Sequence, residues 1–218
     1  MPHAPFHEEI DHRTIKLMIG VVALALAPLT SALSPAPIDS ISAAYYAGGA
    51  AQNVLVGFLF AIAVLLLAYN GRSYAEMWLS KLAALAALGV ALFPCTCGSH
   101  AVHPPWVHGT SATLMFLILV WFCLTFHRRA RTKRHAQARV RATLYAACGA
   151  TIVLAIGVLG LNALLGGVWQ HAAPHLVLYG EAVSLTAFGI AWLTASHALP
   201  GLNHPSERFA PWREQNPP

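Results

Sequence analysis

The sequence predicts an all-α membrane protein, a polytopic bundle of six transmembrane helices with both termini cytoplasmic. Two observations predict this fold class. Only 10% of the 218 residues are charged and 57% are hydrophobic, whereas about 25% of the residues in an ordinary soluble domain are charged. The hydrophobic residues also gather into runs without Lys or Arg, and about 20 apolar residues cross the hydrocarbon core of a bilayer. This composition excludes a soluble globular protein and a disordered one.

Six apolar segments are long enough to be predicted as spans. They are residues 17–33, 53–69, 82–97, 109–126, 143–164 and 176–196. The first segment has some features of a secretory signal, but the acidic residues before it are untypical of the positive leader that such a signal needs. We therefore expect a retained first helix, with a cytoplasmic segment 1–16, a membrane domain 17–196 and a cytoplasmic tail 197–218.

The basic residues predict the orientation, because all 13 lie on one side of this arrangement. Two precede the first span, two lie between the second and third, seven lie between the fourth and fifth, and two follow the last. The positive-inside rule makes that side cytoplasmic. The loop 128–141 either serves only as this topology signal or also binds anionic lipid head groups. The net charge of +5 does not indicate a nucleic-acid partner, because the basic residues form no patch on a soluble surface.

The opposite, outer side holds acids and histidines without any Lys or Arg. Its two acidic residues are Asp39 and Glu181. The other polar candidates are five histidines and two cysteines in short segments of the chain, namely His100, His103, His108, His171, His175, Cys95 and Cys97. These residue types bind metals and transfer protons. We therefore look for a functional site on this side.

Glu181 is the most informative of these residues. It lies about six residues into the last span, roughly 9 Å below the start of the helix. A carboxylate at that depth is costly unless it is neutral, paired with a cation or wetted. A raised pKa, a bound cation or a protonated outer histidine would each meet this need, and a neutral Glu bonded to a neighbouring helix is the simplest alternative. For Asp39, the simplest interpretation is a cap on the following helix.

The outer histidines suggest a metal site. His171 and His175 are spaced i, i+4 and would share one helical face, unless the last span begins near Pro174 and leaves His171 in the preceding loop. With His108, which opens the fourth span, they would hold a zinc ion through imidazole. Cys95 and Cys97 would suit zinc or copper, although their C-x-C spacing is not that of an established zinc site. Four cysteines are too few, and mostly too buried, to predict a disulfide framework.

Several segments resemble a family of uncharacterised bacterial six-span membrane proteins, the domain of unknown function 998 type. The matching segments cover most of the second, third, fourth and sixth spans and include 40–46, 53–57, 68–71, 87–94, His108 with Ser111 and Ala112, and Glu181 with 187–193. The resemblance implies a six-helix bundle in a bacterial inner membrane. It directs attention to Ser42, Tyr46, His108 and Glu181, but it supplies no activity. Gln52 stands where such relatives often carry a basic residue.

A fainter similarity is to the alkaline ceramidase and adiponectin-receptor superfamily of intramembrane zinc amidases. That superfamily uses a Ser, an Asp, a His and a terminal H-x-x-x-H. Here Ser40, Asp39, His108 and the pair His171 and His175 supply the residue types. The chain departs from the pattern in having six predicted spans and a histidine pair that precedes the last span.

Three classes of function follow from these residues. The first is a ligand-binding, permeation or proton-linked module in which Glu181 titrates. The second is a zinc-dependent hydrolase or transferase acting on a lipid or lipid-linked substrate, with zinc on His108, His171 and His175 and with Glu181 or Asp39 as general base. Ser42 is a further catalytic candidate from the family resemblance. The third, a two-haem electron carrier, is disfavoured because His108 and His127 are 19 residues apart, about 28 Å along a helix.

Overall fold

The computed structural model describes residues 11–97, 100 and 104–207, and all regular structure in these ranges is helical. Six helices are long and apolar enough to cross a membrane, which confirms the predicted fold class and a multi-pass membrane protein. They are α1 (His12–Leu33), α3 (Gly49–Ala68), α4 (Tyr74–Leu92), α5 (Trp106–Arg131), α6 (Ala136–Leu164) and α8 (Leu176–Ser196). Three short elements, α2 (Ala44–Ala47), α7 (Val168–Ala172) and η1 (Pro205–Glu207), complete the chain. Most of the predicted segment 1–16, His103 and the tail beyond 207 lie outside the described residues.

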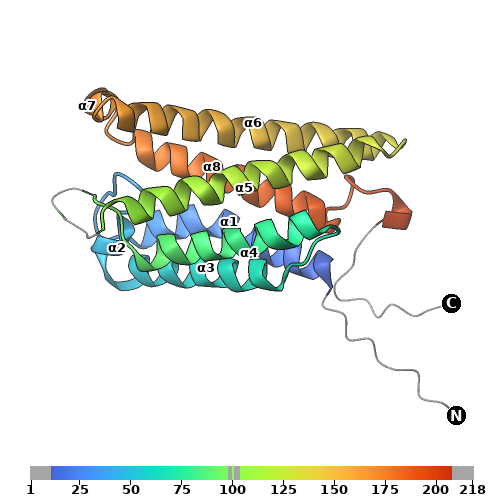
Figure 1. Ribbon diagram of the computed structural model, residues 1–218, viewed down its shortest axis with the longest axis horizontal. Helices are drawn as coiled ribbons and strands as arrows, with labels where there is room; N and C mark the ends of the chain where they lie inside the picture. Colours follow the sequence, from blue (N-terminus) through green and yellow to red (C-terminus); the bar gives the residue numbers. More distant parts are fainter. Residues whose placement is uncertain (1–10, 98–99, 101–103, 208–218) are drawn as a thin grey trace, which may run out of the picture.

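The six long helices form a closed ring in which each packs mainly against two neighbours. The order around the ring is α1, α3, α4, α5, α6 and α8, and α8 packs back against α1. Consecutive long helices run in opposite directions along the long axis of the molecule (Figure 1). The end where α1 begins and α8 ends carries the basic residues of the described ranges, and we name it the basic end. The end that carries α2 and α7 is named the outer end.

Aromatic side chains fill the ring toward its basic end. Trp192 of α8 is fully buried. Its ring centroid lies 5.2–5.7 Å from the centroids of four other rings, those of Tyr69, Phe122, Phe126 and Phe188. All four pairs meet edge to face, the arrangement that aromatic quadrupoles favour. We call these five residues the aromatic plug. It packs the centre of the ring with side chains, so the bundle has a core at this level and not an open pore.

Glycines let α1 and α8 approach closely. A Cβ atom added at Gly20 would lie 2.8 Å from the backbone nitrogen of Leu193 and 3.0 Å from the carbonyl oxygen of Gly189. A Cβ atom added at Gly189 would in turn lie 3.0 Å from the carbonyl oxygen of Gly20. Small residues at such crossings allow helix backbones to pack against each other within a membrane, where van der Waals contact is a main source of helix association.

The third predicted span, 82–97, differs most from the structure, in which α4 begins at Tyr74 and ends at Leu92. The helix begins early because Ser73 caps its N-terminus: Ser73 Oγ accepts from the Glu76 N–H and donates to the Glu76 carboxylate. The buried Glu76 side chain is tolerated because Arg129 of α5 donates to both of its oxygens. The helix ends early because Pro94 disfavours a helical conformation at the residue before it.

The chain after α8 is fastened to α6 by Arg141. The Arg141 side chain is almost fully buried. Its guanidinium donates to the Leu202 carbonyl at 2.6 Å, to Asn203 Oδ1 at 2.9 Å and to the Glu207 carboxylate at 2.8 Å. Charge-assisted hydrogen bonds of this kind are stronger than neutral ones. The segment 197–207 is therefore held against the basic end of the bundle.

Replacing Gly20 by Ala should destabilise the bundle, although alanine favours helices. The added methyl group would meet the α8 backbone, and overpacking of this kind costs about 1–3 kcal/mol, which exceeds the gain of roughly 1 kcal/mol in helix propensity. Gly57→Ala in α3 is the matched control, because a Cβ atom there has nothing within 4 Å, and it should leave stability unchanged or raise it. Thermal unfolding in detergent measures both variants. Equal unfolding temperatures for the two variants would contradict this account of the α1–α8 contact.

The segment 197–207 should separate from α6 in acid. Burial, with Arg141 and Lys133 nearby, lowers the pKa of His197 from 6.5 to about 4. Burial opposes ionisation of Glu207, but hydrogen bonds from Lys133 and Arg141 outweigh it and lower the pKa of Glu207 to about 2. In both cases the released segment binds a proton that the docked segment does not, so docking weakens as pH falls, first from 6.5 to 4 through His197 and then from 4.5 to 2 through Glu207.

Hydrogen exchange of residues 197–207 at pH 7 and pH 4, corrected for the intrinsic rates, measures this release. Protection should fall at pH 4. The variant His197→Gln keeps a hydrogen-bonding side chain without the titration and should flatten the change above pH 4.5. Protection that is equal at the two pH values in the unmodified protein would refute the expectation.

Candidate functional site

The Glu181 carboxylate, in the second turn of α8, is held by the loop between α1 and α2. Its Oε2 atom accepts from the backbone N–H of Ile41 at 2.6 Å and from that of Ser42 at 3.4 Å. Its Oε1 atom lies 2.8 Å from the Ser42 hydroxyl. The same loop is fastened to α8 by a hydrogen bond from the Leu178 N–H to the Asp39 carbonyl at 3.0 Å. Three donors from one loop therefore surround a carboxylate that has no Lys or Arg beside it among the described residues of this end.

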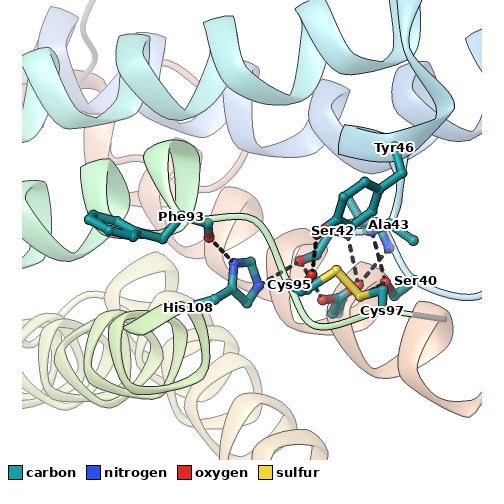
Figure 2. The surroundings of a disulfide bond; sticks show 10 residues. Ser40, Ser42, Ala43, Tyr46, Phe93, Cys95, Cys97 and His108 are labelled. Atoms are coloured by element: carbon teal, nitrogen blue, oxygen red, sulfur yellow. Dashed lines mark hydrogen bonds between the residues drawn. A yellow bond between two sulfur atoms is a disulfide. The ribbon is translucent and has the colours of Figure 1, made fainter. Parts of the chain in front are cut away.

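His108, at the start of α5, joins this site through Ser42. Its Nε2 atom lies 3.2 Å from the Ser42 hydroxyl, and its Nδ1 atom lies 2.8 Å from the carbonyl oxygen of Phe93. Figure 2 shows the His108 ring between these two partners. Phe93 follows the last residue of α4, so the histidine is oriented by the end of a neighbouring helix. Glu181, Ser42, His108 and the Phe93 carbonyl thus form one hydrogen-bonded chain, which we call the outer network.

The hydrogens of the outer network can be counted. A carbonyl oxygen only accepts, so Nδ1 of His108 carries a hydrogen and donates to Phe93. Ser42 has a single hydroxyl hydrogen and two strong acceptors beside it. The chain is complete when Glu181 is protonated and donates to Ser42, which donates to neutral His108. It is equally complete when protonated His108 donates to Ser42, which donates to ionised Glu181. The two arrangements differ by the net transfer of one proton from Glu181 to His108, which reverses both hydrogen bonds of the Ser42 hydroxyl, and neither has a net charge.

A small cavity lies beside the outer network. It has a volume of about 40 Å³, and Ser42 and Glu181 are the polar residues of its lining. The rest of the lining is apolar and includes Leu26, Leu55, Ala112, Met115 and Phe116. A water needs roughly 10–15 Å³ of such space, so the cavity has room for a few waters and not for a lipid chain or another large substrate. It gives the Glu181 side chain a place to exchange a proton with water.

A disulfide between Cys95 and Cys97 shapes the segment after α4. The sequence predicts no disulfide framework and suggests these two cysteines as metal ligands, whereas the structure joins them to each other. Cys123 and Cys148 are free and buried. Tyr46 of α2 donates to the Cys95 carbonyl at 2.6 Å, and Figure 2 shows this ring above the disulfide. Disulfides persist in oxidising compartments. A disulfide at the outer end therefore agrees with the orientation that the basic residues predict.

The other predicted site residues lie apart from the outer network. Asp39 is not a helix cap, because α2 has no side-chain cap and the Asp39 side chain is 75% exposed. Ser40 Oγ instead accepts from the Ala43 N–H at 2.9 Å in the turn before α2. His175 Nδ1 lies 3.4 Å from the Asp39 carboxylate at the rim of the bundle. The last span begins at Leu176, after Pro174, so His171 belongs to the separate helix α7. This is the arrangement in which the two histidines do not share a helical face.

The described residues contain no group of three or more His, Cys, Asp or Glu side chains that could hold a metal ion. His108, His171 and His175 are therefore not gathered into the zinc site that the sequence suggested. Cys95 and Cys97 are not available as thiolate ligands while they are joined to each other. The donor set that the structure assembles at the outer end is suited to hydrogen bonding and proton exchange.

One residue of the site, Phe93, is not predicted from the sequence. No sequence motif identifies the Phe93 carbonyl as a hydrogen-bond partner, because every residue has a backbone carbonyl. Ser40 and the Cys95–Cys97 pair were noticed, but their partners were not: Ser40 Oγ lies 3.7 Å from Cys97 Sγ, which brings residues 57 positions apart together. A loop rich in Ser before a helix signals capping, and this signal favoured Ser40 as much as Asp39.

No family model, curated protein or solved structure matches this chain. The resemblances to the domain of unknown function 998 type and to the ceramidase superfamily therefore stay predictions. The site has to be interpreted from its own geometry.

Thiol labelling in right-side-out vesicles should report the disulfide and the side on which it lies. A membrane-impermeant maleimide should not label the protein until an impermeant reductant opens the Cys95–Cys97 bond, and mass spectrometry should then locate the label on these two residues. Cys123 and Cys148 should stay unlabelled, because they are buried. The double variant Cys95→Ser, Cys97→Ser is the control for background. Labelling of Cys95 or Cys97 without reductant would show that the disulfide does not form.

Proposed function

We propose that this chain is an inner-membrane protein with a proton-linked ligand-binding or transport function, and that the outer network is its proton-handling site at the periplasmic face. The observation that carries the proposal is the position of the Ser42 hydroxyl, 2.8 Å from Glu181 and 3.2 Å from His108 Nε2. A hydroxyl between a carboxyl group and an imidazole passes a proton from one to the other by reversing its own hydrogen bonds. Ionisable side chains within a membrane typically serve such relays.

The surroundings of the network support a site that binds and releases a proton in response to another event. The cavity of about 40 Å³ beside Glu181 has room for a few waters. The aromatic plug lies between this cavity and the basic end, so we place proton uptake and release at the outer end. Proton binding at Glu181 would then be coupled to movement of the loop that carries Ile41 and Ser42, because the backbone N–H groups of this loop donate to the carboxylate.

A hydrolase is the second candidate, and one observation favours it. Ser42 Oγ lies within reach of His108 Nε2, and the Phe93 carbonyl orients the histidine as the third group of a nucleophilic triad would. However, the backbone N–H groups of Ile41 and Ser42, which an oxyanion would need, already donate to Glu181. The adjacent cavity is also too small for a lipid-linked substrate. The proton relay accounts for all three side chains, and the hydrolase for two.

Infrared titration of the purified protein tests the relay. The unmodified protein should show a protonated-carboxyl band that Glu181→Gln removes, whereas Asp39→Asn, which changes an exposed carboxylate at the same end, should leave that band in place. His108→Gln should move the pH midpoint of the band by roughly 0.4 to 2 units, since residues in one hydrogen-bonded network interact by about 0.5–3 kcal/mol and one unit of pKa corresponds to about 1.4 kcal/mol.

Variants of Ser42 distinguish a relay between Glu181 and His108 from two groups that titrate independently. In Ser42→Ala the midpoint should no longer respond to His108→Gln, because the link between the two groups is gone, whereas Ser42→Thr keeps the hydroxyl and should keep the coupling. Ser42→Ala should also lower stability by about 1–3 kcal/mol, the usual consequence of unsatisfied buried partners. The proposal fails if the Glu181 midpoint is the same with and without His108 in a background that retains Ser42.

A further inference from the structure

The basic end contains a cavity of about 50 Å³ whose lining includes five cationic side chains. They come from separate parts of the chain: Lys16 from α1, Arg72 from the turn after α3, Arg129 from α5, Lys133 from the turn after α5, and Arg141 from α6. From this convergence we infer that the basic end binds one phosphate-type oxyanion, either as free phosphate or as the head group of an anionic lipid. This anion site is separate from the outer network and does not depend on the proposed relay.

The carboxylates near the cavity neutralise only part of its charge. Glu76 is engaged by Arg129, which donates to both of its oxygens. Glu207 is engaged by Lys133 at 2.5 Å and by Arg141 at 2.8 Å. The five cations of the lining therefore face two carboxylates, and three positive charges remain for a ligand. His197 also lines the cavity and, as a neutral side chain above pH 4, supplies no charge of its own.

Lys16 shows most directly that a partner is missing. Its side chain is only 8% exposed, and in the described part of the protein it has no hydrogen bond or ion pair. Its Nζ atom lies 5.4 Å and 5.3 Å from the ring centroids of Tyr69 and Phe126. Such cation–π contacts are worth about 0.5–2 kcal/mol each, whereas the burial of an unpaired ammonium costs several kcal/mol. An anion in the adjoining cavity would supply the compensating charge.

The dimensions and the donors indicate the class of ligand. At roughly 10–15 Å³ for each water-sized group, the cavity accommodates about four such groups, which is the size of one tetrahedral oxyanion and much smaller than a nucleotide. Arginine guanidiniums bind phosphate oxygens through paired N–H groups, and a lysine adds a compact charge. The five cationic lining residues lie in turns or within two turns of a helix end, where the phosphates of a bilayer are expected, and Phe126 and Tyr145 supply the apolar side of the lining. Both a lipid phosphate and a soluble one therefore fit.

Thermal unfolding of the protein in phosphatidylcholine nanodiscs tests the site with inorganic phosphate. At constant ionic strength set with chloride, phosphate should raise the unfolding temperature in a saturable manner. In a second arm, phosphatidylglycerol should replace part of the phosphatidylcholine and raise it without added phosphate. A response to phosphate assigns the site to a free anion, and a response to the glycerol lipid alone assigns it to a head group.

The decisive variant is Lys16→Met, which removes the charge and keeps an apolar side chain of similar length. It should weaken the response to phosphate or lipid at least tenfold while raising the unfolding temperature of the ligand-free protein, because an unpaired buried charge is removed. A merely structural lysine would give the opposite change in stability. Arg72→Gln, on an exposed side chain of the same lining, should weaken binding without lowering the ligand-free stability.

The matched control is Arg131→Gln with Arg139→Gln, which removes two exposed charges from the same end outside the cavity lining. This control should keep at least half of the binding affinity, and Glu181→Gln should leave it unchanged because it acts on the other end. The inference is overturned if neither arm gives a saturable response, if Lys16→Met binds like the unmodified protein, or if the control variant loses as much affinity as Lys16→Met.

Discussion

The hydrogen bonds between Glu181 and the backbone of Ile41 and Ser42 are the contact on which the outer end depends. A carboxylate in the second turn of a membrane-spanning helix has to find donors inside the protein, because the bilayer supplies none. Here the loop between α1 and α2 supplies them. The Ser42 hydroxyl of the same loop lies beside Nε2 of His108. Nδ1 of His108 in turn donates to the carbonyl of Phe93, the residue that follows α4. One carboxylate thereby sets the relative positions of α8, the α1–α2 loop, α5 and the end of α4.

The two ends of the bundle meet the same constraint by different means. The outer end contains no cation among its described residues, and it satisfies Glu181 with neutral donors and one exchangeable proton. The basic end pairs its buried carboxylate, Glu76, directly with Arg129 and keeps further cations around a small cavity. Between them the aromatic plug fills the ring with apolar surface. The two ends therefore lie on opposite sides of the aromatic plug.

The sequence anticipated part of the outer site, and the reasons differ from residue to residue. Glu181 stood out because a carboxylate within an apolar run is unusual on its own. His108 was named because of its place at the start of a span, but it was assigned to zinc with His171 and His175, which lie elsewhere. Ser42 was reached through a family resemblance and not from its own chemistry. The Cys95–Cys97 disulfide was not expected, because a C-x-C pair has the same appearance in sequence whether it is joined, metal-bound or free.

The boundaries of the spans also depend in part on contacts that the sequence does not reveal. Residues 74–81 lie outside the third predicted span, because the predicted spans contain no Lys or Arg and Lys81 interrupts the run. In the structure both Glu76 and Lys81 are helical: Glu76 is paired with Arg129, and Lys81 reaches the Leu67 carbonyl and Asn70 across the turn from α3. A charged side chain in a helix costs little free energy when a partner is held close to it in space. For Glu76 that partner is Arg129, which is 53 residues away along the chain and therefore cannot be predicted from the local sequence.

By itself the sequence determined that the chain crosses a membrane, that it does so in six helices, and that its basic residues share one end. These are properties of continuous segments, because an apolar run of about 20 residues and the positions of its flanking charges need no knowledge of neighbours. Only the tertiary structure decided which outer residues meet. Ser42 is 139 residues from Glu181 and 66 from His108 along the chain. These residues come together only because the helix order around the ring places α8 beside α1 and the start of α5 near the loop between α1 and α2.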